Sequence, residues 1–433
     1  MGSNMKKLLG SLALFAMALT AQAGVNIQHW TTPAGARVYF VESRELPIAD
    51  VQVDFAAGAA YDPRDKSGLA GLTRGLLDAG TGDLDEEKIA GRLVDIGARM
   101  SGSSDLDRAG LSLRTLSSTR EREAAVALMR LLLQQPAFPA EVLEREKART
   151  IAGIRETDTR PDSIASRRFS AALYPDHPYG LNATAESISR ITRDDLVAFH
   201  RAHYGARRAV VSIIGDLSRA EAETIAARLT DGLPQAQPDG GLPDVKLPAR
   251  DTVRIAHPAS QSHIYLGLPG VRRGDPDYFP LLVGNYILGG GGFVSRLMKE
   301  VREKRGYAYS VYSYFQPMRQ PGPFQIGLQT KREQAGDALK VVEATLEEFV
   351  LRGPTQEEVK AAKRNLVDGF ALRLDSNRKI LEHLAVIGFY GLPLTYLDDF
   401  QHKVGAVTVD DIRAAFKRHV QPEHIVTVIV AGD

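Results

Sequence analysis

The pattern of hydrophobic and polar positions predicts the same kinds of element twice along the chain. Residues 51–55 and 263–268 alternate between apolar and polar positions, which is typical of a strand with one buried face. Longer stretches with helical spacing of apolar residues predict helices, most clearly at residues 119–135, 141–157, 333–351 and 355–373. Strands that open each half, followed by a block of helices, favour an α+β fold in which each half has a largely antiparallel sheet packed with helices.

An internal repeat supports this division into halves. Residues 191–196 (ITRDDL) have a counterpart at 407–412 (VTVDDI), and residues 209–216 (AVVSIIGD) have one at 426–433 (VTVIVAGD). Each copy combines a threonine N-cap, acidic residues in the first turn of a helix, and a buried apolar strand that ends at Gly-Asp. The two segments recur at offsets of 216 and 217 residues. A repeat this long indicates duplicated domains and not a solenoid.

The length of the chain suits two such domains. A chain of 433 residues is too long for one ordinary core, and two domains of roughly 200 residues each are a common solution. Residues 233–248 are rich in proline and glycine, a composition that predicts a linker. We therefore expect an N-terminal domain over residues 24–232 and a C-terminal domain over residues 249–433.

Composition excludes several classes of function. Hydrophobic residues make up 44% of the chain and charged residues 25%, which are ordinary values for a globular protein. The formal net charge is +1, so the chain lacks the overall positive charge that is typical of nucleic-acid-binding proteins. The sequence contains no cysteine. Thiol catalysis and every cysteine-based metal site are therefore excluded.

The first residues have the pattern of a secretory signal peptide. Lys6 and Lys7 precede an apolar run at residues 8–19, and Ala21-Gln22-Ala23 offers a small-x-small cleavage site. We expect residues 1–23 to be removed on export to a bacterial periplasm, with residues 1–4 a remnant of cloning ahead of a native start at Met5. The apolar run is shorter than the roughly 20 residues that span a bilayer. We therefore expect no membrane attachment after cleavage.

The segment at residues 67–81 (SGLAGLTRGLLDAGT) carries the first candidate chemistry. It resembles the zinc-binding helix of the pitrilysin-type (M16) metallopeptidases, which carries H-x-x-E-H: two histidine ligands and a glutamate that activates water. Here Gly71, Arg74 and Gly75 stand at those three positions. The resemblance covers nearly the whole mature chain, because residues 61–63 (YDP), residues 176–180 (DHPYG) and the Gly-Asp strand ends also fit the family.

The resemblance implies a family member without its metal site. Gly153 stands where the family has its third zinc ligand, a glutamate on a later helix. A glycine side chain has no donor atom for a metal, and a guanidinium has N–H donors but no lone pair to offer one. We therefore expect no metal and no cofactor in this chain. The implied fold is two tandem homologous M16-type domains that form half of a clamshell.

A second cluster lies in the C-terminal half. Four glycines precede a helix, namely Gly289, Gly290, Gly291 and Gly292. Taken alone they suggest a phosphate cradle, but no Lys-Ser/Thr follows as in a Walker A loop, and a mobile helix-entry loop is the better interpretation. Arg302 is compatible with a solvated arginine in a charged turn. Tyr309 is compatible with one strand aromatic among several, on the same face as Tyr307 and Val311.

The resemblance gives these residues a role. Arg302 and Tyr309 match the family's R/Y motif, an arginine and a tyrosine seven residues apart on the domain that lacks zinc. In the family, these groups reach across the cavity and bind the substrate backbone near the scissile bond. A guanidinium and a phenol can both donate hydrogen bonds to a carbonyl that becomes an oxyanion. The glycines at 289–292 are then candidate substrate-binding residues.

Histidine offers one other possibility for a metal. His200 and His203 are separated by one helical turn, a spacing that metal ligands can use. No glutamate lies between them, and their segment resembles an ordinary packing helix. We interpret them as surface histidines.

These observations lead to one preferred hypothesis and two alternatives. The preferred one is the metal-free subunit of a heterodimeric periplasmic M16 metalloendopeptidase, inactive alone. Its partner would be a chain with an intact H-x-x-E-H helix and zinc, and its substrate an unfolded peptide that Arg302 and Tyr309 bind in trans. The first alternative is an inactive peptide-binding or structural scaffold. An independent hydrolase is the weakest alternative, because the sequence has no cysteine and no G-x-S-x-G elbow.

Overall fold

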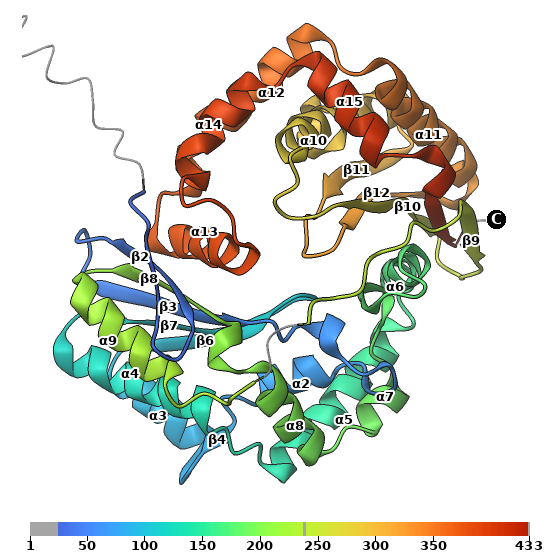
Figure 1. Cartoon of the computed structure of the whole chain (residues 1–433). Helices are drawn as coiled ribbons and strands as arrows, with labels where there is room; N and C mark the ends of the chain where they lie inside the picture. Colours follow the sequence, from blue (N-terminus) through green and yellow to red (C-terminus); the bar gives the residue numbers. More distant parts are fainter. Residues whose placement is uncertain (1–24, 237–239, 432–433) are drawn as a thin grey trace, which may run out of the picture.

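The computed structural model describes residues 25–236 and 240–431, and the first half of the chain forms a six-stranded sheet (Figure 1). The strand order is β1-β2-β8-β3-β7-β6. All neighbouring strands are antiparallel except β2 and β8. The strands are β1 (Gln28–Thr31), β2 (Arg37–Glu42), β3 (Ile48–Phe55), β6 (Arg99–Ser104), β7 (Ala109–Leu116) and β8 (Ala209–Gly215), with a small hairpin of β4 (Gly80–Thr81) and β5 (Leu84–Asp85).

The second half repeats this topology with one strand fewer. Its sheet has the order β11-β12-β10-β13-β9, and only β13 and β9 are parallel. This order matches β6-β7-β3-β8-β2 of the first sheet, strand for strand. The prediction of an α+β fold with two similar, largely antiparallel halves is confirmed. The strands are β9 (Asp251–Ile255), β10 (Gln261–Val271), β11 (Ala308–Phe315), β12 (Gly322–Lys331) and β13 (Val426–Val430).

Helices cover the sheets, and most of the predicted ones are confirmed. In the first half they are α2 (Leu69–Gly75), α3 (Glu86–Asp95), α4 (Thr119–Gln134), α5 (Ala140–Thr157), α6 (Pro161–Leu173), α7 (Ala185–Ser189), α8 (Arg193–His203) and α9 (Arg219–Thr230). In the second half they are α10 (Tyr278–Asn285), α11 (Ala335–Arg352), α12 (Gln356–Asp368), α13 (Asn377–Tyr390), α14 (Tyr396–Ala406) and α15 (Val409–His419). The predicted threonine caps at Thr192 and Thr408 both form capping boxes.

One predicted helix is too long. The helix expected at residues 355–373 ends at Asp368, and a separate 3₁₀ turn follows at Ala371–Arg373. Gly369 lies at the break, and its N–H bonds back to the carbonyls of Asn365 and Val367. Glycine has a low helix propensity, and burial of Phe370 in the core favours the change of direction.

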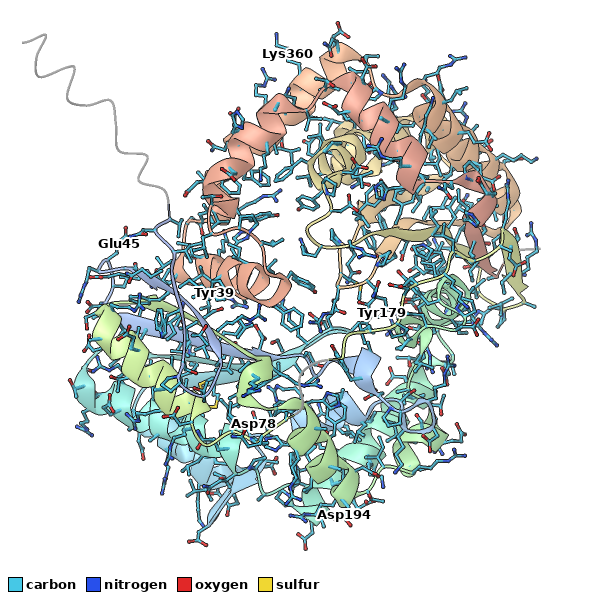
Figure 2. All side chains as sticks on the ribbon, in the orientation of Figure 1. Tyr39, Glu45, Asp78, Tyr179, Asp194 and Lys360 are labelled. Atoms are coloured by element: carbon cyan, nitrogen blue, oxygen red, sulfur yellow. The ribbon has the colours of Figure 1, made fainter. Side chains whose placement is uncertain are left out.

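The two halves exchange a helix. Helix α13 of the second half packs on β2, β3 and β8 of the first sheet, and α6 of the first half packs on β10 and β13 of the second (Figure 1). Figure 2 labels Tyr39 beneath α13, where a Cβ on Gly388 would lie 2.6 Å from the Tyr39 ring. The two helices start 216 residues apart, which is the offset of the sequence repeat. The sheets are therefore tied together by equivalent elements.

This exchange corrects the prediction for residues 51–55. The alternation of that strand indicated one buried and one solvated face, but every one of these residues is buried. The polar positions Gln52 and Asp54 lie on the face that packs toward α13. Asp54 has no exposed surface, so burial raises the pKa of its carboxyl, while the nearby Arg108 guanidinium acts in the opposite direction.

A buried carboxylate joins the halves at their junction. Asp107, in the turn between β6 and β7, accepts hydrogen bonds from Tyr179 Oη at 2.5 Å and from Tyr390 Oη of α13 at 2.8 Å. It also accepts one from the backbone N–H of Arg319, in the turn between β11 and β12, at 2.8 Å. Tyr179 belongs to the DHPYG motif, and Figure 2 labels it where the two halves meet. The motif therefore has a structural role in this chain.

Two sequence predictions concern residues outside this core. The predicted signal peptide, residues 1–23, lies outside the described residues. Within residues 25–236 and 240–431, no helix has the length and apolar character that crossing a bilayer requires. Residues 240–248 of the predicted linker form neither helix nor strand, and the carbonyl oxygens of Leu242 and Pro243 lie within hydrogen-bond distance of the side chains of Gln320 and His177. The predicted domain boundaries stay predictions.

Candidate functional site

Helix α2 carries the positions that match the family's metal-binding motif. The helix begins after Gly68, which has a left-handed φ of 104°. The Asp62 carboxylate then accepts hydrogen bonds from the backbone N–H groups of Gly68 and Ala70, both at 2.7 Å. These two bonds satisfy free amides at the start of the helix. The YDP motif therefore fixes the helix that bears Gly71, Arg74 and Gly75.

The residues at the metal-binding positions do not fit a zinc ion. Gly71 and Gly75 contribute no donor atom, and a Cβ built on either glycine would meet no atom within 4 Å. Thr150 on α5 faces the open space next to Gly71 and Gly75. Gly153 lies on the same helix, about one turn further along. Glu146 is the one carboxylate that lines this space. A single carboxylate is too small a donor set for a four-coordinate ion.

Arg74 takes a structural position in place of the catalytic glutamate. Its guanidinium lies against the edge strand β6, where a Cβ on Gly102 would fall 1.2 Å from Arg74 Nη2. The side chain is only 12% exposed, and its nearest ion-pair partner is Asp78 at 3.6 Å. The guanidinium is thus packed against the edge strand of the sheet.

We expect Gly102→Ala to displace Arg74. The added methyl group overlaps the guanidinium, so the substitution should lower the free energy of unfolding by about 1–3 kcal/mol. In an Arg74→Ala background the same substitution should cost much less, because the space is then empty. Urea denaturation of the two single variants and the double variant measures this coupling. Equal costs of Gly102→Ala in both backgrounds would contradict the packing described above.

Asp62 predicts a pH dependence of stability. Burial raises the pKa of its carboxyl to about 6, although the N–H groups of Gly68 and Ala70 lower it in part. The unfolded chain has an ordinary aspartate pKa near 3.9. Between about pH 4 and pH 6 the folded protein therefore binds a proton that the unfolded chain does not. The free energy of unfolding should fall by up to about 3 kcal/mol as the pH rises through this window.

The substitution Asp62→Asn should remove this pH-dependent part of the free energy of unfolding. Urea denaturation of the parent protein and the variant at pH 4, 5, 6 and 7 provides the comparison. We expect the difference between the two proteins to change across the window, with the variant less affected by the rise in pH. If the difference in free energy of unfolding between the two proteins is the same at all four pH values, the Asp62 carboxyl has the same pKa in the folded and the unfolded chain, which contradicts the prediction.

Arg302 and Tyr309 lie next to each other in the structure. Arg302 lies in the π-helical turn η7 (Met298–Glu303), and Tyr309 lies near the start of β11. The Arg302 guanidinium carbon is 4.8 Å from the centre of the Tyr309 ring and 4.8 Å from the centre of the Phe293 ring. Cation–π contacts with two aromatic rings therefore orient the guanidinium.

Both aromatic rings face solvent. Tyr309 is 84% exposed and Phe293 is 65% exposed. Phe293 was not predicted as a site residue, although its position directly after the glycine run is visible in the sequence. The R/Y pair lies in the second half and the residues of α2 lie in the first, and no hydrogen bond or ion pair of the described residues joins the two groups.

A β-bulge explains the exposure of Tyr309 and corrects one prediction. Tyr309 was expected to share a face with Val311, but Val311 is buried in the core. The register of β11 with β12 shifts between Ala308 and Val311, so Tyr309 and Ser310 oppose a single residue of β12. The extra residue turns Tyr309 outward, as bulges near functional sites commonly do.

The four glycines connect two helical segments, the second of which starts at Arg296, so they precede a helix as predicted. Gly289 and Gly290 end the π-helical turn η5 (Tyr286–Gly290), and Gly291 follows it. Gly289 is buried, and a Cβ there would lie 2.6 Å from the backbone nitrogen of Ser313. Gly292 has a left-handed φ of 62°, and the chain then reaches Phe293. Close packing accounts for the buried glycine. A role of Gly289, Gly290, Gly291 and Gly292 in substrate binding stays a prediction.

The histidine prediction is wrong for His200. This residue is buried, and its Nε2 lies 2.9 Å from the carbonyl oxygen of Leu133. The ring also stacks on Tyr204, so it is a packing residue. Among the described residues, a group of three possible metal ligands occurs at Asp275, Asp277 and His419. The Arg418 guanidinium already binds both carboxylate oxygens of Asp277, which makes this group an ion-pair network.

Comparisons with known proteins agree with this geometry. Residues 37–186 match the family model described as Insulinase (Peptidase family M16), and residues 190–366 match the one described as Peptidase M16 inactive domain. The crystal structure of a peptidase M16 inactive domain from Pseudomonas fluorescens is 40% identical in sequence, with a TM-score of 0.91 over 94% of this chain and 98% of that one. The chain belongs to peptidase family M16.

Two other known proteins are similar to this M16 chain. It is 26% identical to a protein of Helicobacter pylori described as "Non-peptidase homolog YmxG", over 99% of each sequence. It shares its fold with the periplasmic protease PqqL of Escherichia coli, with a TM-score of 0.78 and 16% identity over 96% of this chain and 46% of that one. Together with the missing donor set, the matches to an inactive domain and a non-peptidase homologue identify an inactive M16 homologue made of two tandem M16 domains.

Proposed function

We propose that this M16 homologue is the non-catalytic subunit of a heterodimeric periplasmic metalloendopeptidase. The observation that carries the proposal is a contrast between the two halves. The metal-binding positions hold Gly71, Arg74 and Gly75, whereas the exposed Tyr309 and the partly exposed Arg302 are in contact with each other. A chain that had lost all function in hydrolysis would have no evident need for an oriented, exposed donor pair.

Arg302 and Tyr309 are suited to binding a peptide carbonyl in the partner's site. The Arg302 guanidinium lies over the rings of Phe293 and Tyr309, and a cation–π contact leaves its N–H groups available to donate hydrogen bonds to other partners. The Tyr309 hydroxyl can donate a hydrogen bond to the same oxygen. Donors of this kind stabilise the oxyanion that forms during peptide hydrolysis. The partner subunit, with an intact H-x-x-E-H helix, would supply the zinc ion and the glutamate that activates water.

The outer edge of β6 is the best place for the peptide main chain. β6 and β11 each end their sheet. At β11 the side chain of Asn285 blocks the edge, because its Nδ2 donates to the Ser313 carbonyl at 3.1 Å and its Oδ1 accepts from the Ser313 hydroxyl. Among the described residues, no hydrogen bond uses the outer edge of β6. An extended peptide can therefore pair with β6 through main-chain hydrogen bonds and little sequence preference.

A catalytically inactive scaffold is the second candidate. The name of the Helicobacter pylori relative favours it, since that protein is described as a non-peptidase homologue. The scaffold hypothesis expects the peptide-binding surfaces without a protease partner. The two hypotheses therefore differ in what binds this chain in the cell.

Affinity capture from the periplasm of the native host tests the proposal. The mature chain with a C-terminal tag is used as bait, and the bound proteins are identified by mass spectrometry. We expect a second M16 chain that contains H-x-x-E-H and that co-elutes with the bait in size-exclusion chromatography. Repeated capture without any H-x-x-E-H protein would favour the scaffold.

A further inference from the structure

A hollow of about 290 Å³ occupies the place of the lost metal site. It lies between α2, α5 and α7, and its wall includes Gly71, Leu72, Gly75, Leu76, Thr150 and Ile188. A Cβ atom on Gly71 or Gly75 would meet nothing within 4 Å. The absence of two histidine side chains has therefore left open space and not a collapsed core.

The wall of the hollow does not suit a polar ligand or an ion. Thr150 and Glu146 are the polar residues that line it. The Glu146 carboxylate is already paired with Arg145 at 3.3 Å and with Arg149 at 3.7 Å. The rest of the wall consists of apolar side chains and glycine. A charged group would lose its hydration without compensation there, whereas an apolar group would gain free energy on leaving water.

The free sheet edge at β6 and the hollow share one neighbour, helix α2. Helix α2 packs directly against β6. Arg74, which lies between Gly71 and Gly75 in α2, rests on Gly102 of β6. A peptide that adds to the edge in an extended conformation directs every second side chain to the same side. The edge can thus hold a peptide main chain while one side chain enters the space next to α2.

We infer that the hollow is a side-chain pocket for a bulky apolar residue, such as Leu, Met or Phe, of an extended peptide bound along β6. This inference rests on the proposed binding of unfolded peptide and names the side chain that the site prefers. The chain would have replaced metal ligands by a recognition pocket. Burial of one such side chain corresponds to a gain of about 10-fold to 100-fold in affinity.

Two fluorescein-labelled peptides and two variants of the full mature chain test the pocket. The peptides are extended Thr/Gln-rich sequences that are identical except for a central Phe or a central Ser, and binding is followed by fluorescence anisotropy. The variant Gly75→Leu fills the hollow, and Gly91→Leu is the matched control. Gly91 is also an exposed helical glycine with nothing within 4 Å of its Cβ, but it lies on α3, away from the hollow.

We expect the unaltered protein and Gly91→Leu to bind the Phe peptide at least about 10-fold more tightly than the Ser peptide. In Gly75→Leu this preference should disappear. Circular dichroism verifies the fold, and Gly71→Leu serves as a second filling variant. Binding with the same Phe preference in both filling variants overturns the pocket but leaves the proposed function intact. If neither peptide binds the unaltered protein, both the pocket and the proposed peptide binding fail.

Discussion

The double substitution Arg302→Ala with Tyr309→Phe should lower kcat/KM of the assembled two-subunit peptidase by about 10³-fold or more. Removal of one oxyanion donor typically costs about 10²-fold to 10³-fold in rate, and here both donors are lost. Because the two residues are proposed to bind the same carbonyl group, the effects of the single substitutions should not add fully. Complex formation should be unchanged, since Tyr309 is exposed, Arg302 is partly exposed, and neither side chain belongs to the hydrophobic core.

A neighbouring arginine provides the control for this experiment. Arg305 lies just beyond η7, where its guanidinium binds Glu300 and not an aromatic ring. Arg305→Ala should leave kcat/KM within a few-fold of the parent value. Phe293→Leu should give an intermediate loss, because it removes one of the two rings that orient Arg302. Full activity of the double variant in a complex of normal stability would rule out a catalytic contribution of the pair.

Asp107→Ala should lower the free energy of unfolding by about 3–5 kcal/mol. The carboxylate is 1% exposed and accepts hydrogen bonds from Tyr179, Tyr390 and the Arg319 N–H. Alanine leaves these buried donors without an acceptor, and each unsatisfied group costs about 1–3 kcal/mol. The bonds connect the two halves, so the loss should also weaken the coupling between them.

Chemical denaturation with two probes measures this effect. The single tryptophan, Trp30, reports on the first half, and circular dichroism reports on the whole chain. We expect a lower transition midpoint and, in Asp107→Ala, a separation of the two transitions. Tyr390→Phe, which removes one donor and keeps the ring, should cost only about 1 kcal/mol. An unchanged midpoint in Asp107→Ala would mean that the junction is held by the exchanged helices alone.

Local patterns in the sequence predicted much of the fold. The repeat around Thr192 and Thr408, the apolar strands and three of the four long helices depend on neighbouring residues, and the structure confirms them. The burial of residues 51–55 could not be predicted in this way. It depends on α13, more than 320 residues further along the chain, which covers the polar side of β3. The alternation of polar and apolar residues shows the chemistry of the two faces of a strand. It does not show which elements pack on each face.

The candidate site shows the same limit. The family motif identified Gly71, Arg74 and Gly75 in α2 and the pair Arg302 and Tyr309, and the structure brings the members of each group together. Spacing could not reveal that Arg74 rests on Gly102 of another strand. It could not reveal the outward turn of Tyr309 either, because a β-bulge reverses the faces that simple alternation predicts.

The most direct test combines metal analysis with an assay of cleavage. The isolated mature chain is purified without chelator, its zinc content is determined by mass spectrometry, and its activity on an unfolded casein substrate is measured with and without EDTA. We predict substoichiometric zinc and no cleavage until an H-x-x-E-H subunit is added. Stoichiometric zinc together with EDTA-sensitive cleavage by the isolated chain would contradict the account.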